Sequence, residues 1–241
     1  MNEWLEPHPI WVVGHRGAPR KARENTFDSF DFAETAGADA IEFDTQQTRD
    51  GELVVFHDPD VAIGSARHAL RDMHSLDLRS LRLDSPLGEY GIPTLERLFE
   101  RYGASLRWVI EVKTTPRTDR PRVAARLSEL VASFGVGRRC VVASFDADFL
   151  EKLHARDESL ALSFLVDRSE ALLGARPVTS AVGPRHDLVT AEWMSQARSG
   201  NLSVHPWTVD DPAEVERLVG LGVASITSND VEMVRRVLGR G

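Results

Sequence analysis

Short apolar runs alternate with segments of helical periodicity along most of the chain. The runs cover residues 11–14, 40–44, 108–112, 140–145, 161–166, 202–209 and 224–227. In residues 121–134, apolar positions recur every three or four residues, which is typical of a helix with one buried face. The runs are nearly all apolar, as expected of strands covered on both sides. This alternation predicts parallel βαβ units.

Residues at the expected helix ends support this division. Asn25 precedes a helical segment and Asp28 follows three positions later, so we expect Asn25 to cap the first helix. Asp211 and Pro212 are residue types that begin a helix, and glycines end the same segment. Residues 228–230 should open the last helix.

The number of units indicates the fold. About eight units in 241 residues match a (β/α)8 barrel, for which roughly 250 residues are typical. An open doubly wound sheet is the alternative. No GxGxxG or GxxxxGK[ST] sequence follows a predicted strand, so the nucleotide-binding form of that alternative lacks its main support. We therefore predict a single α/β domain over residues 1–241, a TIM barrel.

Two segments interrupt the alternation. Asp50 and Gly51 stand between two β-type runs, which is a strong hairpin signal. We expect a β-hairpin over residues 44–57, with these two residues as its turn and Asp44 opposite His57. Residues 59–92 are polar and low in strand signal, so we expect a small insertion with one short helix rather than a second core.

The amino-acid composition limits the binding partners and the cellular location that the sequence predicts. The 29 Lys and Arg against 37 Asp and Glu give a net charge of -8, which disfavours nucleic acid as a partner. Residues 1–14 lack the basic region and the long apolar region expected of a secretion leader, and no apolar run approaches the roughly 20 residues that span a bilayer. The sequence thus predicts a soluble, cytoplasmic protein without integral membrane association. Cys140, the only cysteine, stands in an apolar run and should be an inert core thiol.

Charged residues lie two apart at the ends of two predicted strands. Glu42 and Asp44 should share one face of their strand, and Glu111 and Lys113 one face of another. In a barrel, the C-terminal strand ends form the active-site face. Three carboxylates are hard oxygen ligands of the kind that Mg²⁺ or Ca²⁺ prefers. Simple ion pairing of Glu111 with Lys113 or Arg16 is the alternative.

The first strand ends in an unusual turn. His15 and Arg16 stand between Gly14 and Gly17, where the backbone can turn sharply and a ligand can approach closely. Arg16 offers a fixed fork of donors for a phosphate. His15 and His57 can supply one base and one acid near neutral pH. Together with the carboxylates, these groups indicate metal-assisted phosphodiester cleavage.

Several motifs carry a family resemblance. The sequence resembles the glycerophosphodiester phosphodiesterase family, and GHRG combined with ExD and the following HD is the specific part of the match. The matching segments run in order along nearly the whole chain: GHRG (14–17), ENT (24–26), EFD (42–44), TRDGELVVFHD (48–58), GIPTL (91–95), EVK (111–113), SF (144–145), WTV (207–209) and GVASITSN (222–229).

The resemblance implies a TIM barrel with a small insertion after the HD motif, and it implies roles for eight residues. Glu42, Asp44 and Glu111 would hold one divalent cation, Mg²⁺ or Ca²⁺ with Mn²⁺ as a further option. His15 and His57 would be the acid/base pair, and Arg16 and Lys113 would contact the phosphate. Trp207 would form an apolar wall beside the substrate. For Trp207, a half-buried aromatic at the barrel rim is the alternative. The chain departs from the family pattern after the HD motif and at Ala224, Ser228 and Asn229, which bears on substrate choice.

The predicted activity is hydrolysis of glycerophosphodiesters, such as glycerophosphocholine or glycerophosphoethanolamine, to glycerol 3-phosphate and an alcohol. One histidine would take a proton from the glycerol 2-hydroxyl and the other would protonate the leaving alcohol, and direct attack by water is the rival route. Cleavage of lysophospholipids and a non-catalytic phosphate- or metal-binding barrel are the alternative functions. A metal-dependent isomerase or lyase is a more distant one.

Overall fold

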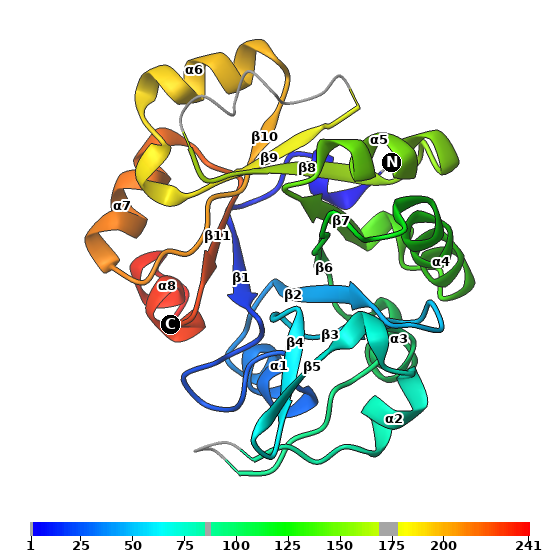
Figure 1. Cartoon of the computed structure of the whole chain (residues 1–241). Coiled ribbons are helices and arrows are strands. Elements are labelled where there is room, and N and C mark those ends of the chain that lie inside the picture. The colour runs from blue at the N-terminus through cyan, green and yellow to red at the C-terminus, as the bar shows by residue number, and fades with distance from the viewer. Residues whose placement is uncertain (1, 85–87, 169–177) are drawn as a thin grey trace.

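Eight parallel strands form a nearly closed ring in the computed structural model of the chain, which describes residues 2–84, 88–168 and 178–241 (Figure 1). Their order around the ring is β10-β9-β8-β7-β6-β2-β1-β11. The seam between β10 and β11 is bridged by a hydrogen bond from the Ala224 amide to the Val204 carbonyl, at 2.8 Å. The strands are β1 (Trp11–His15), β2 (Ala40–Gln47), β6 (Trp108–Val112), β7 (Cys140–Ser144), β8 (Ala161–Val166), β9 (Ala181–Pro184), β10 (Ser203–Val204) and β11 (Ser225–Ser228).

Helices surround the ring on its outside (Figure 1). Their apolar faces pack on the strands and form the main hydrophobic core, so the predicted TIM barrel is confirmed. The described α-helices around the ring are α1 (Phe27–Thr35), α3 (Leu95–Tyr102), α4 (Arg120–Ser133), α5 (Ala147–Arg156), α6 (Ala191–Ser199), α7 (Pro212–Leu221) and α8 (Val231–Val237). Short 3-10 turns are η1 (Glu3–Leu5), η3 (Gly103–Ser105), η4 (Gly137–Arg139) and η6 (His186–Leu188). No helix of the described residues is both long and apolar enough to cross a membrane.

Helix caps follow the sequence with one exception. Asp211 caps α7, which ends at Gly222 in the left-handed conformation, and Asp230 caps α8, as expected. The cap of α1 is Thr26, whose hydroxyl accepts from the Ser29 amide, so the predicted cap at Asn25 is wrong. Asn25 has a φ of 58° and turns its amide toward β2 instead.

Two strands near the seam deviate from the apolar runs. β9 contains Gly183 and Pro184, residues that usually break strands, and no apolar run predicted it. β10 is only two residues long, although the run extends over residues 202–209. Pro206 lies in this run and cannot donate to a ladder, which limits the strand.

The predicted hairpin exists with a register shifted by one residue. β3 (Leu53–Val55) runs antiparallel to β2, with Thr45 opposite Val55. The amide of Thr48 donates to the Glu52 carbonyl, so the loop has three residues rather than two. Gly51 at φ 94° completes such a loop, a type I turn followed by a left-handed residue. The predicted pairing of Asp44 with His57 is therefore wrong. The backbone carbonyl of Asp44 accepts from the Phe56 amide, and His57 lies beyond β3.

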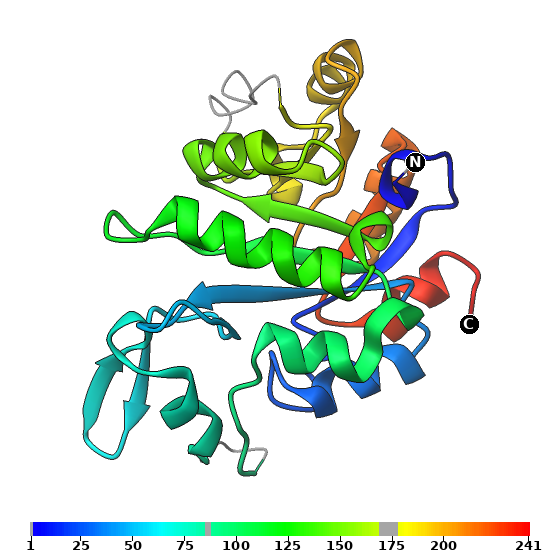
Figure 2. The same ribbon diagram turned by 90° about the vertical axis from the view of Figure 1, so that its right-hand side faces the viewer.

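The insertion forms a small layer beside the barrel. It contains β4 (Asp60–Ile63), β5 (Ala66–Ala69), the 3-10 turn η2 (Leu70–Asp72) and α2 (Ser75–Ser80). The antiparallel pair β4–β5 contradicts the expectation of little strand structure, and residues 85–87 of the predicted insertion lie outside the described residues. Leu70, Leu78 and Ile92 belong to an apolar cluster separate from the main core, which also contains Val54 and Phe56 of the hairpin. Figure 2 shows the insertion at the end of the barrel toward which β2 points.

The opposite end of the barrel is closed by η1. Trp4 is almost fully buried, packs edge-on against Trp11 with ring centres 4.8 Å apart, and donates its indole N–H to the Arg139 carbonyl. The side chain of Asn2 donates to the carbonyls of Gly137 and Cys140. Access to the barrel interior is therefore from the rim that carries the C-terminal strand ends.

Candidate active site

The turn after β1 is built around two glycines at which a side chain would clash with neighbouring atoms. A Cβ on Gly14 would lie 2.5 Å from the Gly17 carbonyl oxygen, and one on Gly17 would lie 2.4 Å from the Ser29 hydroxyl. Arg16 itself has a φ of 52°. This left-handed residue directs its own amide to Glu42 Oε2 at 2.9 Å. The tight turn therefore brings β1 against the carboxylate of β2.

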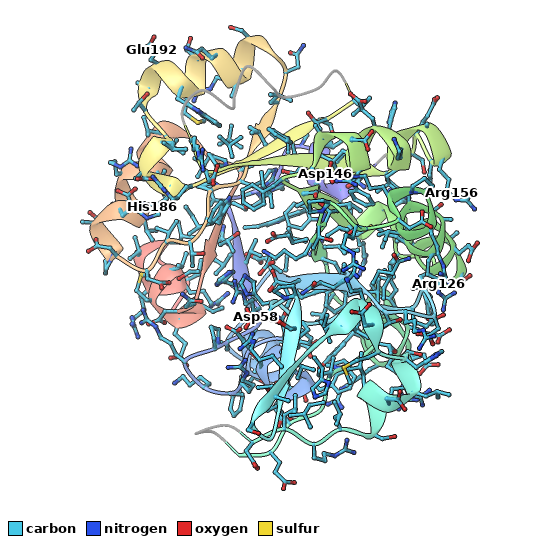
Figure 3. All side chains as sticks on the ribbon, viewed as in Figure 1. Asp58, Arg126, Asp146, Arg156, His186 and Glu192 are labelled. Atoms are coloured by element: carbon cyan, nitrogen blue, oxygen red, sulfur yellow. The ribbon has the colours of Figure 1, made fainter. Side chains whose placement is uncertain are left out.

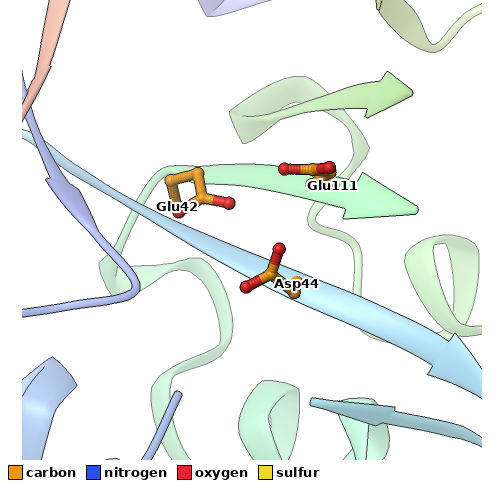
Figure 4. Close-up of side chains that lie close together, drawn as sticks. All are labelled: Glu42, Asp44 and Glu111. Atoms are coloured by element: carbon orange, nitrogen blue, oxygen red, sulfur yellow. The ribbon is translucent and has the colours of Figure 1, made fainter. Parts of the chain in front are cut away.

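Three carboxylates meet at the C-terminal end of the barrel (Figure 4). Glu42 and Asp44 project from β2, and Glu111 projects from β6, where the strand register pairs it with Asp44. One oxygen from each carboxylate lies within 4.8 Å of the others. Alternation along both strands puts these side chains on the inner face, as the sequence predicts.

Two cationic side chains border this carboxylate cluster. Arg16 Nε lies 3.0 Å from Asp44 Oδ2, and the Arg16 guanidinium also donates to Glu24 at 3.1 Å. Lys113 Nζ lies 3.1 Å from Asp44 Oδ1 and contacts Glu111 Oε1. Both cations are held in place by acids, so their positions are fixed before any substrate binds.

Crowding of the carboxylates shifts their pKa values in different directions. Burial, followed by the charges of Asp44 and Glu111, raises the pKa of Glu42 well above its usual value. Burial and Asp44 also raise the pKa of Glu111, against the effect of Lys113. Burial alone would raise the pKa of Asp44, but the charges of Lys113 and Arg16 outweigh it and lower this pKa. Like charges close together resist simultaneous ionisation.

This carboxylate cluster fits a divalent cation. Glu42 Oε1 is buried and has no hydrogen-bond partner among the described residues. An unpaired buried oxygen is costly, and a cation beside it would satisfy the oxygen and offset the repulsion between Glu42, Asp44 and Glu111. An all-carboxylate donor set suits a hard cation. These three residues could therefore hold a metal ion.

Two histidines enter the site from different elements. His15, at the end of β1, lies with Nε2 3.9 Å from Glu42 Oε2. Burial, followed by the charge of Arg16, lowers the pKa of His15. His57 follows β3, is more exposed than His15, and its Nδ1 lies 2.8 Å from Asp58 Oδ1. The two imidazoles line the same cavity.

A cavity of about 260 Å³ opens at this rim, and side chains crowd the centre of the strand ring below it (Figure 3). Trp207 forms part of its wall, and the indole N–H donates to the Gly183 carbonyl at 2.7 Å. Phe145 packs edge-on against Trp207, with ring centres 5.7 Å apart. One side of the cavity is thus charged, and the other side is apolar and rigid.

All eight residues singled out in the sequence come together here. Asp44 is fully buried and contacts Arg16 and Lys113 at the cavity wall. The other seven line the cavity: His15, Arg16, Glu42, His57, Glu111, Lys113 and Trp207. Their roles as ligands, acid, base and phosphate contacts stay predictions. Cys140 is buried away from the cavity, and burial raises the pKa of its thiol to about 12, as expected of an inert residue.

Sequence reasoning missed Asn25. Its amide donates to Asp44 Oδ2 at 2.8 Å, and its Oδ1 accepts from the Asp44 backbone amide at 3.3 Å. The ENT segment, residues 24–26, is the sequence signal for this residue, but the helical pattern after it favours Asn25 as a helix cap. Asn25 therefore braces a member of the carboxylate cluster.

The fold and this charged rim define an α/β-barrel of the phosphodiesterase class. Residues 15–233 match the glycerophosphoryl diester phosphodiesterase family. The chain belongs to this family and is an enzyme.

Sequence similarity to individual phosphodiesterases supports this assignment. A glycerophosphodiester phosphodiesterase of Bacillus subtilis is 28% identical over 97% of this chain and 88% of its own length. Another, of Caldanaerobacter subterraneus, is 27% identical over 95% of this chain and 98% of its own length.

Solved structures show the same fold. A putative glycerophosphoryl diester phosphodiesterase of Silicibacter pomeroyi superposes with a TM-score of 0.87 at 26% identity, covering 98% of this chain and 96% of that one. An Oleispira antarctica phosphodiesterase, solved with its product sn-glycerol-3-phosphate, has a TM-score of 0.81 at 19% identity, covering 96% and 97%.

Proposed function

We propose that the chain hydrolyses glycerophosphodiesters of small alcohols, such as glycerophosphocholine and glycerophosphoethanolamine, to glycerol 3-phosphate and the free alcohol. The convergence of two fixed cations, two histidines and two carboxylates on one cavity, with the carboxylate of Asp44 buried beside them, carries this proposal. The product bound to the Oleispira antarctica relative supports the glycerol phosphate half of the substrate. Glu42, Asp44 and Glu111 would hold Mg²⁺, Ca²⁺ or Mn²⁺, and the ion, when bound, would neutralise charge on the phosphoryl oxygens.

Charge and shape favour a compact anionic substrate. Arg16 and Lys113 offer positive groups to a phosphodiester, and each is already oriented by acidic neighbours. Arg16 can form two parallel hydrogen bonds to phosphate oxygens. Trp207 and Phe145 present apolar edges to the carbon atoms of glycerol or of the alcohol.

The two histidines would carry the proton transfers. One imidazole accepts the proton of the attacking hydroxyl, and the other donates a proton to the oxygen of the departing alcohol. If the glycerol 2-hydroxyl attacks, a five-membered cyclic phosphate forms and water opens it in a second step. If water attacks, glycerol 3-phosphate forms directly. An analogue without the 2-hydroxyl distinguishes these routes, since only the second can cleave it.

Release of glycerol 3-phosphate tests the activity. We expect release from glycerophosphocholine or glycerophosphoethanolamine that stops with a chelator and returns with Mg²⁺, Ca²⁺ or Mn²⁺. His15→Ala and His57→Ala should each lower kcat by about 100-fold or more. Glu192→Gln removes an exposed acid on α6 (Figure 3) and serves as the control. Full release in the presence of chelator would contradict the metal requirement.

Metal binding has a readout that needs no substrate. A cation that binds only the folded chain stabilises it by about 2.7 kcal/mol at 100 times its dissociation constant. We expect Mg²⁺, Ca²⁺ or Mn²⁺ to raise the melting temperature of the wild type and of Glu192→Gln, and the shift to vanish in Asp44→Asn. If the ion stabilises the protein while glycerophosphodiesters stay intact, lysophosphatidylcholine is the substrate to test next.

A further inference from the structure

We propose that Asn229 is a positioning residue, which holds the His15 ring from the side remote from the carboxylate cluster, and that Asp210 anchors Asn229 in turn. The Asn229 Oδ1 lies 2.7 Å from His15 Nδ1, and Asn229 Nδ2 lies 2.6 Å from Asp210 Oδ2. The inference rests on the proposed function in that His15 is one of the two groups that transfer protons.

The ionised carboxylate of Asp210 fixes the direction of both hydrogen bonds that link Asp210, Asn229 and His15. An ionised carboxylate can only accept, so the Asn229 atom that faces Asp210 is the amide nitrogen. The carbonyl oxygen of Asn229 must then face His15, and an amide oxygen can only accept. His15 Nδ1 is therefore the donor. In neutral His15 the other nitrogen, Nε2, carries no proton and lies on the side of Glu42.

Asp210 is itself firmly held. One of its oxygens accepts from the Asn229 backbone amide at 2.9 Å and from the Ser228 hydroxyl at 3.0 Å, and Arg20 lies 3.7 Å from the other. Burial would raise the pKa of Asp210, but the hydrogen bonds from Asn229 and Ser228 outweigh it and lower this pKa. The anchor thus stays ionised at neutral pH.

The barrel register places these residues side by side. β1 pairs with β11 so that Gly14 lies opposite Ser228, which puts His15 next to Asn229 across the two strand ends. The segment before α7 joins the same strand, because the Val209 amide donates to the Thr227 carbonyl. Asp210 follows directly. Three segments separated in the sequence therefore meet behind His15.

This arrangement serves both protonation states of His15. A protonated imidazole donates from both nitrogens, so the bond from Nδ1 to Asn229 persists when Nε2 gains a proton. Proton transfer at Nε2 then requires no rotation of the ring. Without Asn229 the ring can turn, and the neutral form can place its proton on either nitrogen. A fixed ring matters because small displacements of a reacting group cost about 100-fold in rate.

Nitrogen NMR of the histidine side chains tests the tautomer without substrate. In the metal-free protein, above the pH at which imidazole is protonated, we expect the His15 proton on Nδ1. The His15→Gln spectrum identifies the signal. In Asn229→Leu, which keeps the volume but removes the acceptor, this signal should change to a mixture of tautomers. A proton on Nε2 in the wild type would overturn the inference, whatever the catalytic activity proves to be.

Kinetics separate positioning from general stability. Asn229→Leu should lower kcat for glycerophosphocholine by about 10- to 100-fold with little change in KM. The same substitution in a His15→Ala background should cause no further loss, since its effect acts through His15. An equal loss in both backgrounds would refute the role. Asp211→Asn, which retains a capping residue next to Asp210, is the control.

An exchanged pair provides the rescue. In the double variant Asp210→Asn/Asn229→Asp, the new carboxylate accepts from His15 Nδ1 and from the new amide, so the whole chain of hydrogen bonds can re-form. We expect kcat within about threefold of the wild type. Asn229→Asp alone would set two carboxylates against each other and should be far less active. A double variant as inactive as Asn229→Leu, with unchanged folding, would contradict the proposal.

Discussion

Asn25 shows how one amide supports a charged site. Asp44 is fully buried between Arg16 and Lys113, and Asn25 both donates to its carboxylate and accepts from its backbone amide. To do so Asn25 adopts a φ of 58°, a conformation that asparagine tolerates better than most residues. Backbone strain and electrostatic support are thus combined in a single residue.

Substitutions of Asn25 can separate these two contributions. Asn25→Ala and Asn25→Gly both remove the hydrogen bonds to Asp44, and each should lower metal affinity or activity by about 10- to 100-fold. Glycine accepts a positive φ freely, so Asn25→Gly should be more stable than Asn25→Ala by about 1 kcal/mol. Urea unfolding and a glycerol 3-phosphate assay measure the two effects. Unchanged activity in Asn25→Gly would show that the amide contributes nothing to Asp44.

The charged residues of the strands could be predicted from the sequence, but their supports could not. The positions of Glu42, Asp44 and Glu111 follow from alternation along β2 and β6, a local property. The contacts of Asn25 and Asn229 depend on which strands become neighbours. An asparagine before a helical segment is usually a cap, and only the folded chain reveals that Thr26 takes this role.

At the scale of elements, the hairpin shows that a turn sequence predicts where the chain reverses but not how long the loop is. Asp50 and Gly51 correctly indicate that the chain reverses, but they fit a two-residue and a three-residue loop equally well. The three-residue loop is the one formed, and this choice moves the register by one position. Likewise, β4 and β5 have only four residues each and pair with each other outside the barrel, so no long apolar run indicates them in the sequence.

The 3-10 turn η1 closes the barrel with a single large side chain. We expect Trp4→Ala to destabilise the protein by about 3–5 kcal/mol, because it empties a buried site and leaves the Arg139 carbonyl without the indole donor. Leu5 is 42% exposed in the same turn, and Leu5→Ala should change stability by less than about 1 kcal/mol. Urea unfolding compares the two. Equal effects would mean that Trp4 does not close the core.

At the scale of the whole molecule, a buried histidine links folding to pH. His205 lies inside the barrel beside Trp4, with Nδ1 2.9 Å from the Ser225 hydroxyl. Burial, followed by the charge of His8, lowers the pKa of His205 to about 3. An unfolded histidine binds a proton near pH 6.5. Below that pH the unfolded chain binds one more proton than the folded chain, so acid favours unfolding.

The free energy of unfolding should therefore be highest above about pH 6.5 and should fall toward pH 3 by up to about 1.4 kcal/mol per pH unit from this residue. His205→Gln should reduce that slope. His68→Gln, which alters an exposed histidine on β5, should leave it unchanged. Urea unfolding at a series of pH values provides the measurement. An identical slope in His205→Gln and the wild type would exclude His205 as the source.

The route of the chain through the insertion begins and ends close to β3. The chain leaves the rim after Asp58 and returns at Pro93, whose carbonyl accepts from the Val55 amide at 2.8 Å, while Thr94 forms a bridge with Val54. Exit and return thus lie close to β3, and the described buried apolar residues between them pack in one cluster with Val54 and Phe56 of the hairpin. We expect loops of other lengths to be accepted between these two points provided that they cover Val54 and Phe56. Such grafts would vary the surroundings of the charged rim while the strands that carry its residues stay in place.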